Sequence, residues 1–320
     1  MLEKVMMKGI SGGKQGNIVS GNAYGIDCSN SQMLALTSCS ANGFVLGPAD
    51  CTTCTSNAYF LNLDAASLNA TVSPDNLADG DPVIYLYGAK NRTLSYLDLT
   101  HGSLPGTNFG KIAVLNSQGV TIERVQVAKV STNGVLGSAI HLSSCQNCTI
   151  RNALVRDVTG APGAAVYLKG TPGYVVENLT AYNIGASGGT TGRGVLVEAA
   201  ATATVRNSLF SSINGYGAFF EGTAPAKVLV TYSDFFNTTA GDGSGVTLTT
   251  NFHFDPKFAN PGTGDFHLLP ASAGIDSGDP ASACGSEPAP NGCRVNLGRY
   301  GNTSEAETRL GASHCTVCPP

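Results

Sequence analysis

Two glutamates and a lysine stand at equivalent places in successive copies of an internal repeat, and they are well suited to acid–base chemistry. Lys169 is followed one copy later by Glu198 and two copies later by Glu221. If the copies stack as strands, neighbouring positions lie about 4.8 Å apart. Adjacent carboxylates could then bind Ca²⁺ or share acid and base duties, with the lysine as the base of a β-elimination. We favour a simpler interpretation, a salt-bridged column that fixes strand register.

The exposed positions two residues before this column carry a histidine and two aromatic residues, His141, Tyr167 and Phe219. Tyr167 and Phe219 are the best platforms that the chain offers to a sugar ring, and His141 is a further acid–base candidate. Arg193 is the nearest basic partner for Lys169. The two fall at opposite ends of their strands, roughly 16 Å apart at ~3.3 Å per residue, which is too far for one sugar.

A second column of charges alternates in sign. Its members follow one another at the repeat interval: Glu123, Arg151, Glu177 and Arg206. Opposite charges on neighbouring strands hold register, so we interpret this column as structural.

The ten cysteines form five pairs that are close in sequence. The pairs that we predict to be disulfides are Cys28–Cys39, Cys51–Cys54, Cys145–Cys148, Cys284–Cys293 and Cys315–Cys318. Some have CxxC spacing, which also suits zinc or redox chemistry. A zinc site needs two such pairs brought together, and redox CxxC motifs begin a helix beside a strand. Neither context is visible, so local disulfides formed in an oxidising compartment are the better account.

An internal repeat of about 27 residues must position these side chains. Each copy has two apolar strands with alternating buried and exposed residues. The inward residues of the first strand are Leu86, Val114, Leu142, Leu168, Val197, Phe220 and Leu248. Those of the second strand are Leu94, Ile122, Ile150, Val176, Val205 and Val230. One copy cannot bury its own apolar face, and no helical pattern intervenes. The repeat therefore predicts an all-β fold, a right-handed parallel β-helix solenoid.

Three asparagines fall at one place in the repeat, just after the second strand: Asn152, Asn178 and Asn207. Asparagine tolerates the left-handed backbone conformation that a sharp bend requires, and its amide can bond to the copies above and below. This arrangement resembles the asparagine ladder of pectin-lyase-like β-helices. The resemblance implies the same fold.

After residue 250 the pattern changes and resembles the closing segment of secreted bacterial right-handed β-helix proteins, commonly written DPxF…GDFHLxPxSxxIDxGDP…DxGxYG. The matching residues are Asp255, Phe258, Asp265, Phe266, Leu268, Pro270, Ile275, Asp276, Gly278, Asp279, Pro280, Gly298, Tyr300 and Gly301. Asn296 replaces the usual acidic residue before Gly-x-Tyr. With the repeat, the resemblance covers roughly residues 80–302. It implies architecture rather than activity, because lyases, adhesin-like proteins and uncharacterised surface proteins share this ending.

The resemblance also implies where enzymes of this fold act, namely on acidic polysaccharide in a groove along the outer face of one sheet. The clustered aspartates of polygalacturonases and pectate lyases are absent from this sequence. The chain thus carries no recognisable catalytic signature.

We expect three parts: an N-terminal cap with irregular strands over residues 1–57, rungs over 58–250, and a closing segment with a disulfide-tied tail over 251–320. Phe60 and Leu68 stand one repeat before Leu86 and Leu94, which places a first rung near residue 58. Residues 1–15 are apolar enough at their front to dock onto a neighbouring copy. They lack the apolar core of a complete signal peptide.

The composition argues against two classes of interaction, nucleic-acid binding and a membrane span. Charged residues make up 12% of the chain and the formal net charge is −4, so there is no basic footprint for nucleic acid. No apolar run approaches the ~20 residues of a membrane span. We expect an extracellular or cell-surface protein with no cofactor, apart from Ca²⁺ as an option at Glu198 and Glu221.

Three classes of function stay open. We favour an extracellular structural or adhesive protein, which could self-associate into surface filaments, because a rod with few charges and local disulfides suits durable contact. The alternatives are a polysaccharide lyase or hydrolase acting on an acidic polysaccharide, and a non-catalytic carbohydrate-binding protein.

Overall fold

The computed structural model describes residues 84–101, 110–132, 137–160, 163–185, 191–222, 227–309 and 318, together with the backbone of short strands outside these ranges. Those outlying strands are β1 (Leu2–Glu3), β2 (Met6–Lys8), β3 (Ala23–Asp27), β4 (Ala35–Thr37), β5 (Ser40–Asn42), β6 (Ala58–Asn62), β7 (Thr71–Val72), β8 (Leu77–Ala78), β9 (Asp81–Pro82) and β13 (Leu104–Thr107). Phe60 lies in β6, which pairs with β3, whereas Leu68 lies outside the described residues. The division of the chain at residues 57 and 250 stays a prediction.

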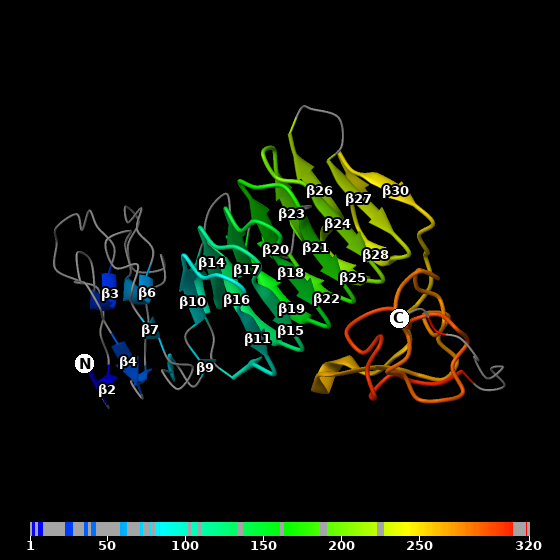
Figure 1. Cartoon of the computed structure of the whole chain (residues 1–320), viewed down its shortest axis with the longest axis horizontal. Coiled ribbons are helices and arrows are strands. Elements are labelled where there is room, and N and C mark those ends of the chain that lie inside the picture. The colour runs from blue at the N-terminus through cyan, green and yellow to red at the C-terminus, as the bar shows by residue number, and fades with distance from the viewer. Residues whose placement is uncertain are drawn as a thin grey trace.

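Three parallel sheets wind around one apolar core (Figure 1). The first sheet contains β10 (Ile84–Tyr87), β14 (Ile112–Leu115), β17 (Gly137–Ser143), β20 (Gly163–Lys169), β23 (Gly192–Glu198), β26 (Gly215–Glu221) and β29 (Gly241–Ser244). The second contains β11 (Thr93–Ser95), β15 (Thr121–Glu123), β18 (Thr149–Arg151), β21 (Tyr174–Glu177), β24 (Ala203–Arg206), β27 (Val228–Thr231) and β30 (Thr247–Thr249). The third contains β12 (Asp98–Leu99), β16 (Gln126–Thr132), β19 (Leu154–Thr159), β22 (Thr180–Ile184), β25 (Leu209–Ile213) and β28 (Asp234–Thr238), and β13 also pairs with β16. Each strand pairs with its equivalent in the next turn, so the fold is a parallel β-helix.

The predicted register of the second strand is confirmed along its whole length. Neighbours in the predicted column pair residue to residue, from Leu94 with Ile122 through to Val205 with Val230. The side chains from Ile122 to Val230 in this column are at most 1% exposed. Burial of one column by the next turn is the main source of stability in such a solenoid.

The predicted column of the first strand is confirmed from Leu86 to Phe220, and it is wrong at Leu248. Leu248 lies in the second sheet, where it pairs with Val230. The last turn is shorter than the others, because β30 follows β29 after a bend at Gly245, whose φ is +68°. A count at the ordinary repeat interval therefore reaches the wrong sheet.

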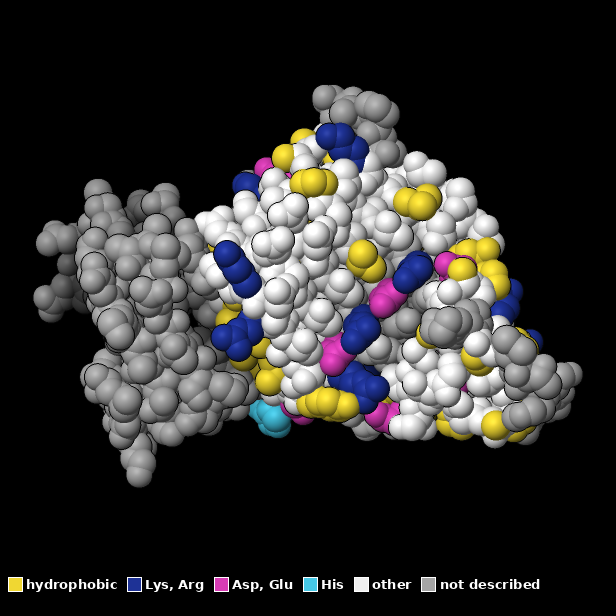
Figure 2. Space-filling view, in the orientation of Figure 1, with side chains coloured by type: hydrophobic (Ala, Val, Ile, Leu, Met, Phe, Trp, Pro, Cys, Tyr) yellow, Lys and Arg dark blue, Asp and Glu magenta, His cyan; other side chains and the backbone are white. Residues whose placement is uncertain are grey.

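The alternating column on the second sheet consists of ion pairs, as predicted. Arg151 pairs with Glu123 at 2.6 Å, and Arg206 pairs with Glu177 at 2.8 Å. Figure 2 shows these side chains as a diagonal line of alternating basic and acidic groups across one face. The column is a register device on the surface.

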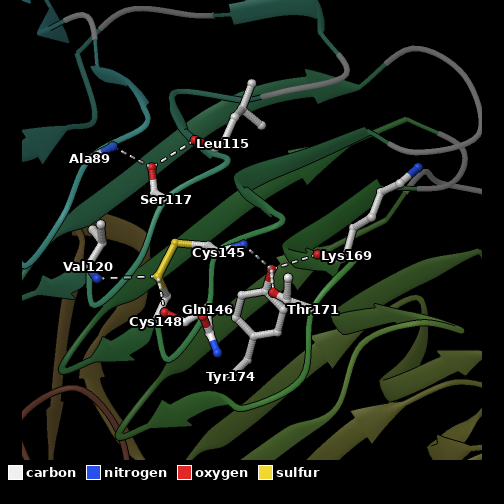
Figure 3. The surroundings of a disulfide bond; sticks show 10 residues. All are labelled: Ala89, Leu115, Ser117, Val120, Cys145, Gln146, Cys148, Lys169, Thr171 and Tyr174. Atoms are coloured by element: carbon white, nitrogen blue, oxygen red, sulfur yellow. Dashed lines mark hydrogen bonds between the residues drawn. A yellow bond between two sulfur atoms is a disulfide. The ribbon is translucent and has the colours of Figure 1, made fainter. Parts of the chain in front are cut away.

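The predicted disulfide between Cys145 and Cys148 is confirmed, with an S–S distance of 2.06 Å (Figure 3). It ties the bend between β17 and β18. The buried Tyr174 hydroxyl supports the same bend: it accepts a hydrogen bond from Cys145 N at 3.1 Å and donates one to Lys169 O at 2.7 Å. This bridge links neighbouring strands of one turn, as local spacing suggests.

The predicted pairs Cys284–Cys293 and Cys315–Cys318 are wrong. Cys284 bonds to Cys318, 34 residues away, at 2.10 Å. Cys293 is also disulfide-bonded, but not to Cys284. The tail returns to the closing segment, so proximity in space overrides proximity in sequence. The predicted pairs Cys28–Cys39 and Cys51–Cys54 lie outside the described residues.

The bend after each second-sheet strand is held by a residue in the left-handed conformation, with φ between 46° and 57°. Asn152, Asn178 and Asn207 occupy three of these positions, as predicted. The other members of this column are Tyr96, Arg124, Tyr232 and Thr250. We call the whole column the ladder. The left-handed conformation costs asparagine little free energy, and larger residues adopt it where the bend requires it.

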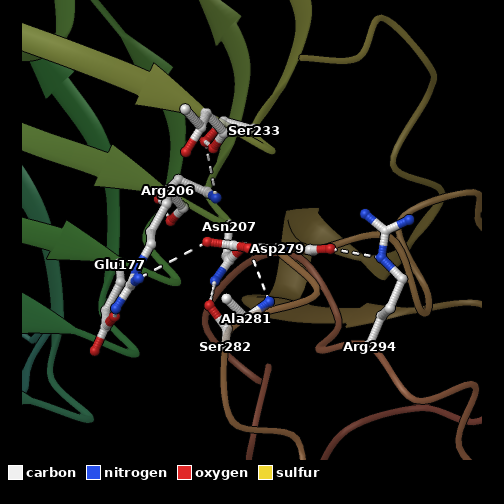
Figure 4. A network of polar contacts seen from close by, with 11 residues as sticks. Glu177, Arg206, Asn207, Ser233, Asp279, Ala281, Ser282 and Arg294 are labelled. Atoms are coloured by element: carbon white, nitrogen blue, oxygen red, sulfur yellow. Dashed lines mark hydrogen bonds and ion pairs between the residues drawn. The ribbon is translucent and has the colours of Figure 1, made fainter. Parts of the chain in front are cut away.

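The amides of the ladder bond mainly to the closing segment, not to the copies above and below as expected. Asn152 Nδ2 donates to the carbonyl oxygens of Arg299 and Gly301, at 3.0 and 2.7 Å. Asn207 Oδ1 accepts a hydrogen bond from Asp279 N at 2.7 Å, and its Nδ2 donates to Ser282 Oγ at 2.8 Å (Figure 4). The reason is that the closing segment passes along the ladder and presents backbone groups to it.

One glycine of the closing motif explains this close passage. A Cβ on Gly301 would lie 2.1 Å from Asn178 Nδ2, so only glycine allows the backbone to approach the ladder there. With the backbone this close, Asn178 Nδ2 donates to the carbonyl oxygens of two other residues of the closing segment, Asn296 and Gly298, at 2.9 and 3.1 Å. It also donates to Asn207 O at 3.4 Å, which among the described residues is the one bond of a ladder amide to a neighbouring turn.

The closing segment also packs against the outer face of the third sheet. Tyr182 of β22 makes edge contacts with Phe258 of β31 (Phe258–Asn260) and Phe266 of β32 (Asp265–Leu268). A single 3₁₀ turn, η3 (Pro261–Thr263), joins these two antiparallel strands. The segment thus lies along the side of the solenoid. Among the described residues, β29 and β30 pair with a strand on one side only.

Candidate functional site

Three of the predicted site residues meet in one network on the outer face of the first sheet. Lys169 Nζ lies 3.2 Å from Glu198 Oε2. The Tyr167 hydroxyl donates to the same carboxylate oxygen at 2.9 Å. The side chains of Lys169 and Glu198 are 40% and 30% exposed, whereas Tyr167 is fully buried. The ion pair that we predicted is therefore present, and a buried phenol supports it.

Tyr167 lies beneath this network and does not present its ring to solvent. Burial raises its pKa well above the ordinary value, and the hydrogen bond and negative charge of Glu198, followed by the charge of Glu221, raise it further. The phenol therefore stays protonated and acts as a donor. His141 packs edge-on against it with ring centroids 4.8 Å apart, and is itself only 4% exposed.

Glu221 extends the network by one turn, since it pairs directly with Glu198 in register. Phe219 lies two residues before it, under the Arg193 guanidinium, whose Cζ is 4.2 Å from the ring centroid. Burial is the main effect on Arg193 and lowers its pKa, and the nearby charges of Tyr216 and Glu221 oppose that shift. The outer face thus combines one ammonium, one guanidinium and two carboxylates.

Lys169 and Arg193 fall at opposite ends of their strands, as predicted. Ala164 pairs with Arg193 and Leu168 pairs with Val197, so the two basic residues are separated along the sheet. The Arg193 side chain nevertheless reaches along its strand to Phe219. The strand register alone does not predict this contact between Arg193 and Phe219.

Calcium at Glu198 and Glu221 stays a prediction. In the part of the chain that the structure describes, no group of three or more His, Cys, Asp or Glu side chains is arranged to hold a metal ion. Two carboxylates in register are fewer ligands than Ca²⁺ takes, so water or ligand oxygens would have to complete the shell.

Two buried carboxylates were not predicted. Asp234, at the start of β28, is 0% exposed, and burial raises its pKa to about 7. Its Oδ1 accepts a hydrogen bond from Phe254 N at 2.9 Å. Burial also raises the pKa of Glu287 to about 7, and its Oε1 accepts hydrogen bonds from Asn296 N and Asn302 N, at 2.8 and 2.7 Å. Both carboxylates organise the closing segment.

A pocket of about 230 Å³ also escaped prediction. It lies where the closing segment meets the first positions of the ladder, and Tyr96, Arg124, Arg299 and Glu305 are among its lining residues. The repeat interval places Tyr96 and Arg124 in line with the ladder asparagines. This spacing was the sequence signal that could have indicated one side of the pocket. Arg299 and Glu305 come from far along the chain, so only the folded structure brings them in.

No helix among the described residues is long and apolar enough to cross a membrane. Comparison with the curated proteins gives no match to this chain. Comparison with protein-family models matches residues 82–258 to the right-handed β-helix region, and this match spans more than half of the chain. The hand of the solenoid is thereby confirmed, and so is the predicted fold class. From its repeat, its three parallel sheets and this match together, the chain belongs to the right-handed β-helix family.

Proposed function

We propose that this protein is an extracellular structural or adhesive β-helix that associates end to end through its last turn. The observation that carries this proposal is Leu248. It continues the buried column of the second sheet above Val230, yet it is 38% exposed, because no further turn covers it in the part of the chain that the structure describes. A second copy stacked on this end would complete the column.

The backbone at this end suits such stacking. All residues of β30 are exposed. An edge strand without charge or proline is a template for pairing with another chain. β30 (TLT) has neither, and Phe266 of the closing segment packs against Tyr182 of the third sheet, along the side of the solenoid. An association that does not close on itself generates a filament.

The disulfides support an extracellular location. Cys145–Cys148 and Cys284–Cys318 are formed, and structural disulfides persist in oxidising compartments. They would keep the bend of one turn and the closing segment intact outside the cell.

Lysines on the edge test the proposal. The variant with Thr247→Lys and Thr249→Lys places charge on β30 and should abolish association while the solenoid stays folded. Thr204→Lys is the matched control, because it lies in β24, an inner strand of the same sheet. Light scattering over a range of concentrations and electron microscopy are the measurements. A wild-type protein that stays monomeric at high concentration contradicts the proposal.

Deleting residues 1–15 is a separate test. The sequence suggests that this segment docks onto a neighbour, and it contributes only the backbone of β1 and β2 to the described structure. If residues 1–15 form the surface that meets the last turn of the next copy, their deletion should abolish assembly and change the thermal midpoint of unfolding little.

A second candidate function is action on, or binding of, an acidic polysaccharide at the first sheet. The observation in its favour is the network of Lys169, Glu198 and Tyr167, with Glu221 one turn on. Lyase activity would appear as absorbance of unsaturated products from alginate, pectate or chondroitin, and it should vanish in Lys169→Ala. Lack of activity with and without Ca²⁺ would leave the network as a structural column.

A further inference from the structure

The N-terminal strands follow the same three-sheet order as the solenoid. β1, β4 and β7 form one parallel sheet, β2, β5 and β8 pair in parallel in another, and β3 pairs with β6. Each turn of the solenoid runs from the first sheet to the second and then to the third. β10 opens the first sheet, so β7 and β8, which come before it, correspond to the second and third sheets, and β9 only doubles back on β8. β1 therefore corresponds to the second sheet, β2 to the third and β3 to the first.

The last strand of the solenoid belongs to the sheet to which β1 corresponds. β30 lies in the second sheet, and the chain then reaches the third sheet in a single bridge between Phe252 and Asp234. Two residues separate β30 from Phe252, and two residues separate β1 from β2. Each second-sheet strand from β11 to β27 has a link of the same length to the third sheet, at the ladder. The bend of the N-terminal turn thus has the length of the bend at the other end.

Apolar residues stand in register at both ends of this sheet order. At the N-terminal end Leu2 pairs with Leu36, and Leu36 pairs with Val72. At the other end Leu248 pairs with Val230. Among the described strands, β1 and β30 each pair on one side only, and Figure 1 shows the N-terminal strands and β30 at opposite ends of the molecule. An unpaired edge leaves a row of backbone N–H and C=O groups for another strand.

The two ends also carry opposite charge. Residues 1–15 contain one glutamate and three lysines, Glu3, Lys4, Lys8 and Lys14. Residues 234–256 contain no lysine or arginine and three aspartates, Asp234, Asp242 and Asp255. Asp255 is exposed and the Asp242 side chain is 24% exposed, so both can attract the lysines of another copy. Charge therefore favours contact between unlike ends over contact between like ends.

We propose that the last turn receives the N-terminal turn of a second copy, with β1 pairing in parallel with β30 and Leu2 in register with Leu248. The proposal rests on the end-on association described above, to which it adds the partner surface and the register. Every pairing of β1, and every pairing of β30, is already parallel within one chain, so the contact continues the same winding. Contact between unlike ends does not close on itself, and each added copy offers the same end again.

Cross-linking between variants that each add one cysteine tests the register. Thr249→Cys lies next to Leu248 in the exposed strand β30, and Glu3→Cys lies next to Leu2 in β1. In the proposed register the two positions face each other at about 4.8 Å, within the Cα–Cα range of a disulfide. Thr247→Cys is the matched control, because it lies in the same strand but about 8 Å from the facing position, too far for a disulfide.

Mild oxidation of the Thr249→Cys and Glu3→Cys proteins together should give a dimer joined between these two positions, identified by mass spectrometry of non-reduced peptides. Neither variant alone should give a dimer. A Thr249→Cys protein that cross-links to itself shows that like ends meet and overturns the proposal, as does equal cross-linking of the Thr247→Cys control. Copies that associate by light scattering without the expected cross-link overturn this register alone. A wild-type protein that stays monomeric overturns the end-on association as well.

A charge in the apolar register is a second test. Leu2→Asp should raise the dissociation constant of association at least about tenfold, because a carboxylate would be buried against Leu248. Leu229→Asp is the matched control, since Leu229 is 41% exposed and pairs with Thr247 rather than with Leu248. Light scattering at several concentrations measures both. Association that Leu2→Asp leaves unchanged overturns the contact between Leu2 and Leu248.

Discussion

The two charge columns of this solenoid have the same spacing and different surroundings. On the second sheet, basic and acidic residues alternate, and each arginine pairs with the glutamate of the turn before it. On the first sheet, Lys169 is followed by two glutamates, and a buried tyrosine lies beneath the pair. A column in which the charges simply alternate in sign serves to fix the register of neighbouring strands. A column that breaks the alternation, and rests on buried polar groups, is the better place to look for function.

The largest effect should come from the buried support of the first column. Tyr167→Ala should destabilise the protein by about 3–5 kcal/mol, because it leaves a cavity on the outer face of the first sheet, where the ring packs against Ala164 and Leu196. Tyr167→Phe keeps the ring and should cost only about 1 kcal/mol, for the lost bond to Glu198. Urea denaturation measures both. Similar costs for the two variants would show that the hydroxyl, rather than the packing, supports the column.

Asp234 is a buried carboxylate near the last turn, in contrast to the exposed charges of the second column. The charged groups that act on it are His253, Asp242 and Asp255. Its folded pKa of about 7 lies above its unfolded value of 3.8, so the native state holds the proton more tightly. Its contribution to stability is complete below pH 3.8 and is lost as pH rises to about 7.

Asp234→Asn should therefore gain stability relative to the wild type between pH 4 and pH 7, by about a few kcal/mol in total. Thermal unfolding of both proteins across this pH range is the measurement. A constant difference between the two would show that Asp234 does not titrate in the window.

The second column should respond weakly, because its ion pairs are exposed. A double-mutant cycle with Glu123→Gln and Arg151→Gln should give a coupling free energy of about 0.2–1 kcal/mol that falls with added salt. A coupling that persists at high salt would mean that the second column is more than a surface register device.

The smallest effect should come from the glutamate that breaks the alternation. Glu221→Gln removes a like charge directly opposite Glu198 and should stabilise the protein by about a few tenths of a kcal/mol. If Ca²⁺ binds there, it should raise the thermal midpoint of the wild type and not of this variant. Destabilisation by Glu221→Gln would instead indicate that Glu221 neutralises Arg193.

Sequence patterns predicted the parts of the site that follow the repeat. The pairing of Lys169 with Glu198, and of Glu123 with Arg151, follows from residues at equal positions in successive turns. The burial of Tyr167 does not follow, because alternation assigns its side chain to the outer face and says nothing about what covers that face. The pocket could not be predicted in full for a similar reason, since Arg299 reaches the ladder from far along the chain.

By itself, the sequence determined the solenoid and its register. Alternating apolar residues at a constant interval leave one stacking arrangement that buries every copy, so Ile150 had to lie on Ile122. Only the tertiary structure decided the course of the closing segment, the Cys284–Cys318 bond and the exposed position of Leu248. These depend on contacts between distant segments and on the shortened last turn, and no local periodicity encodes either.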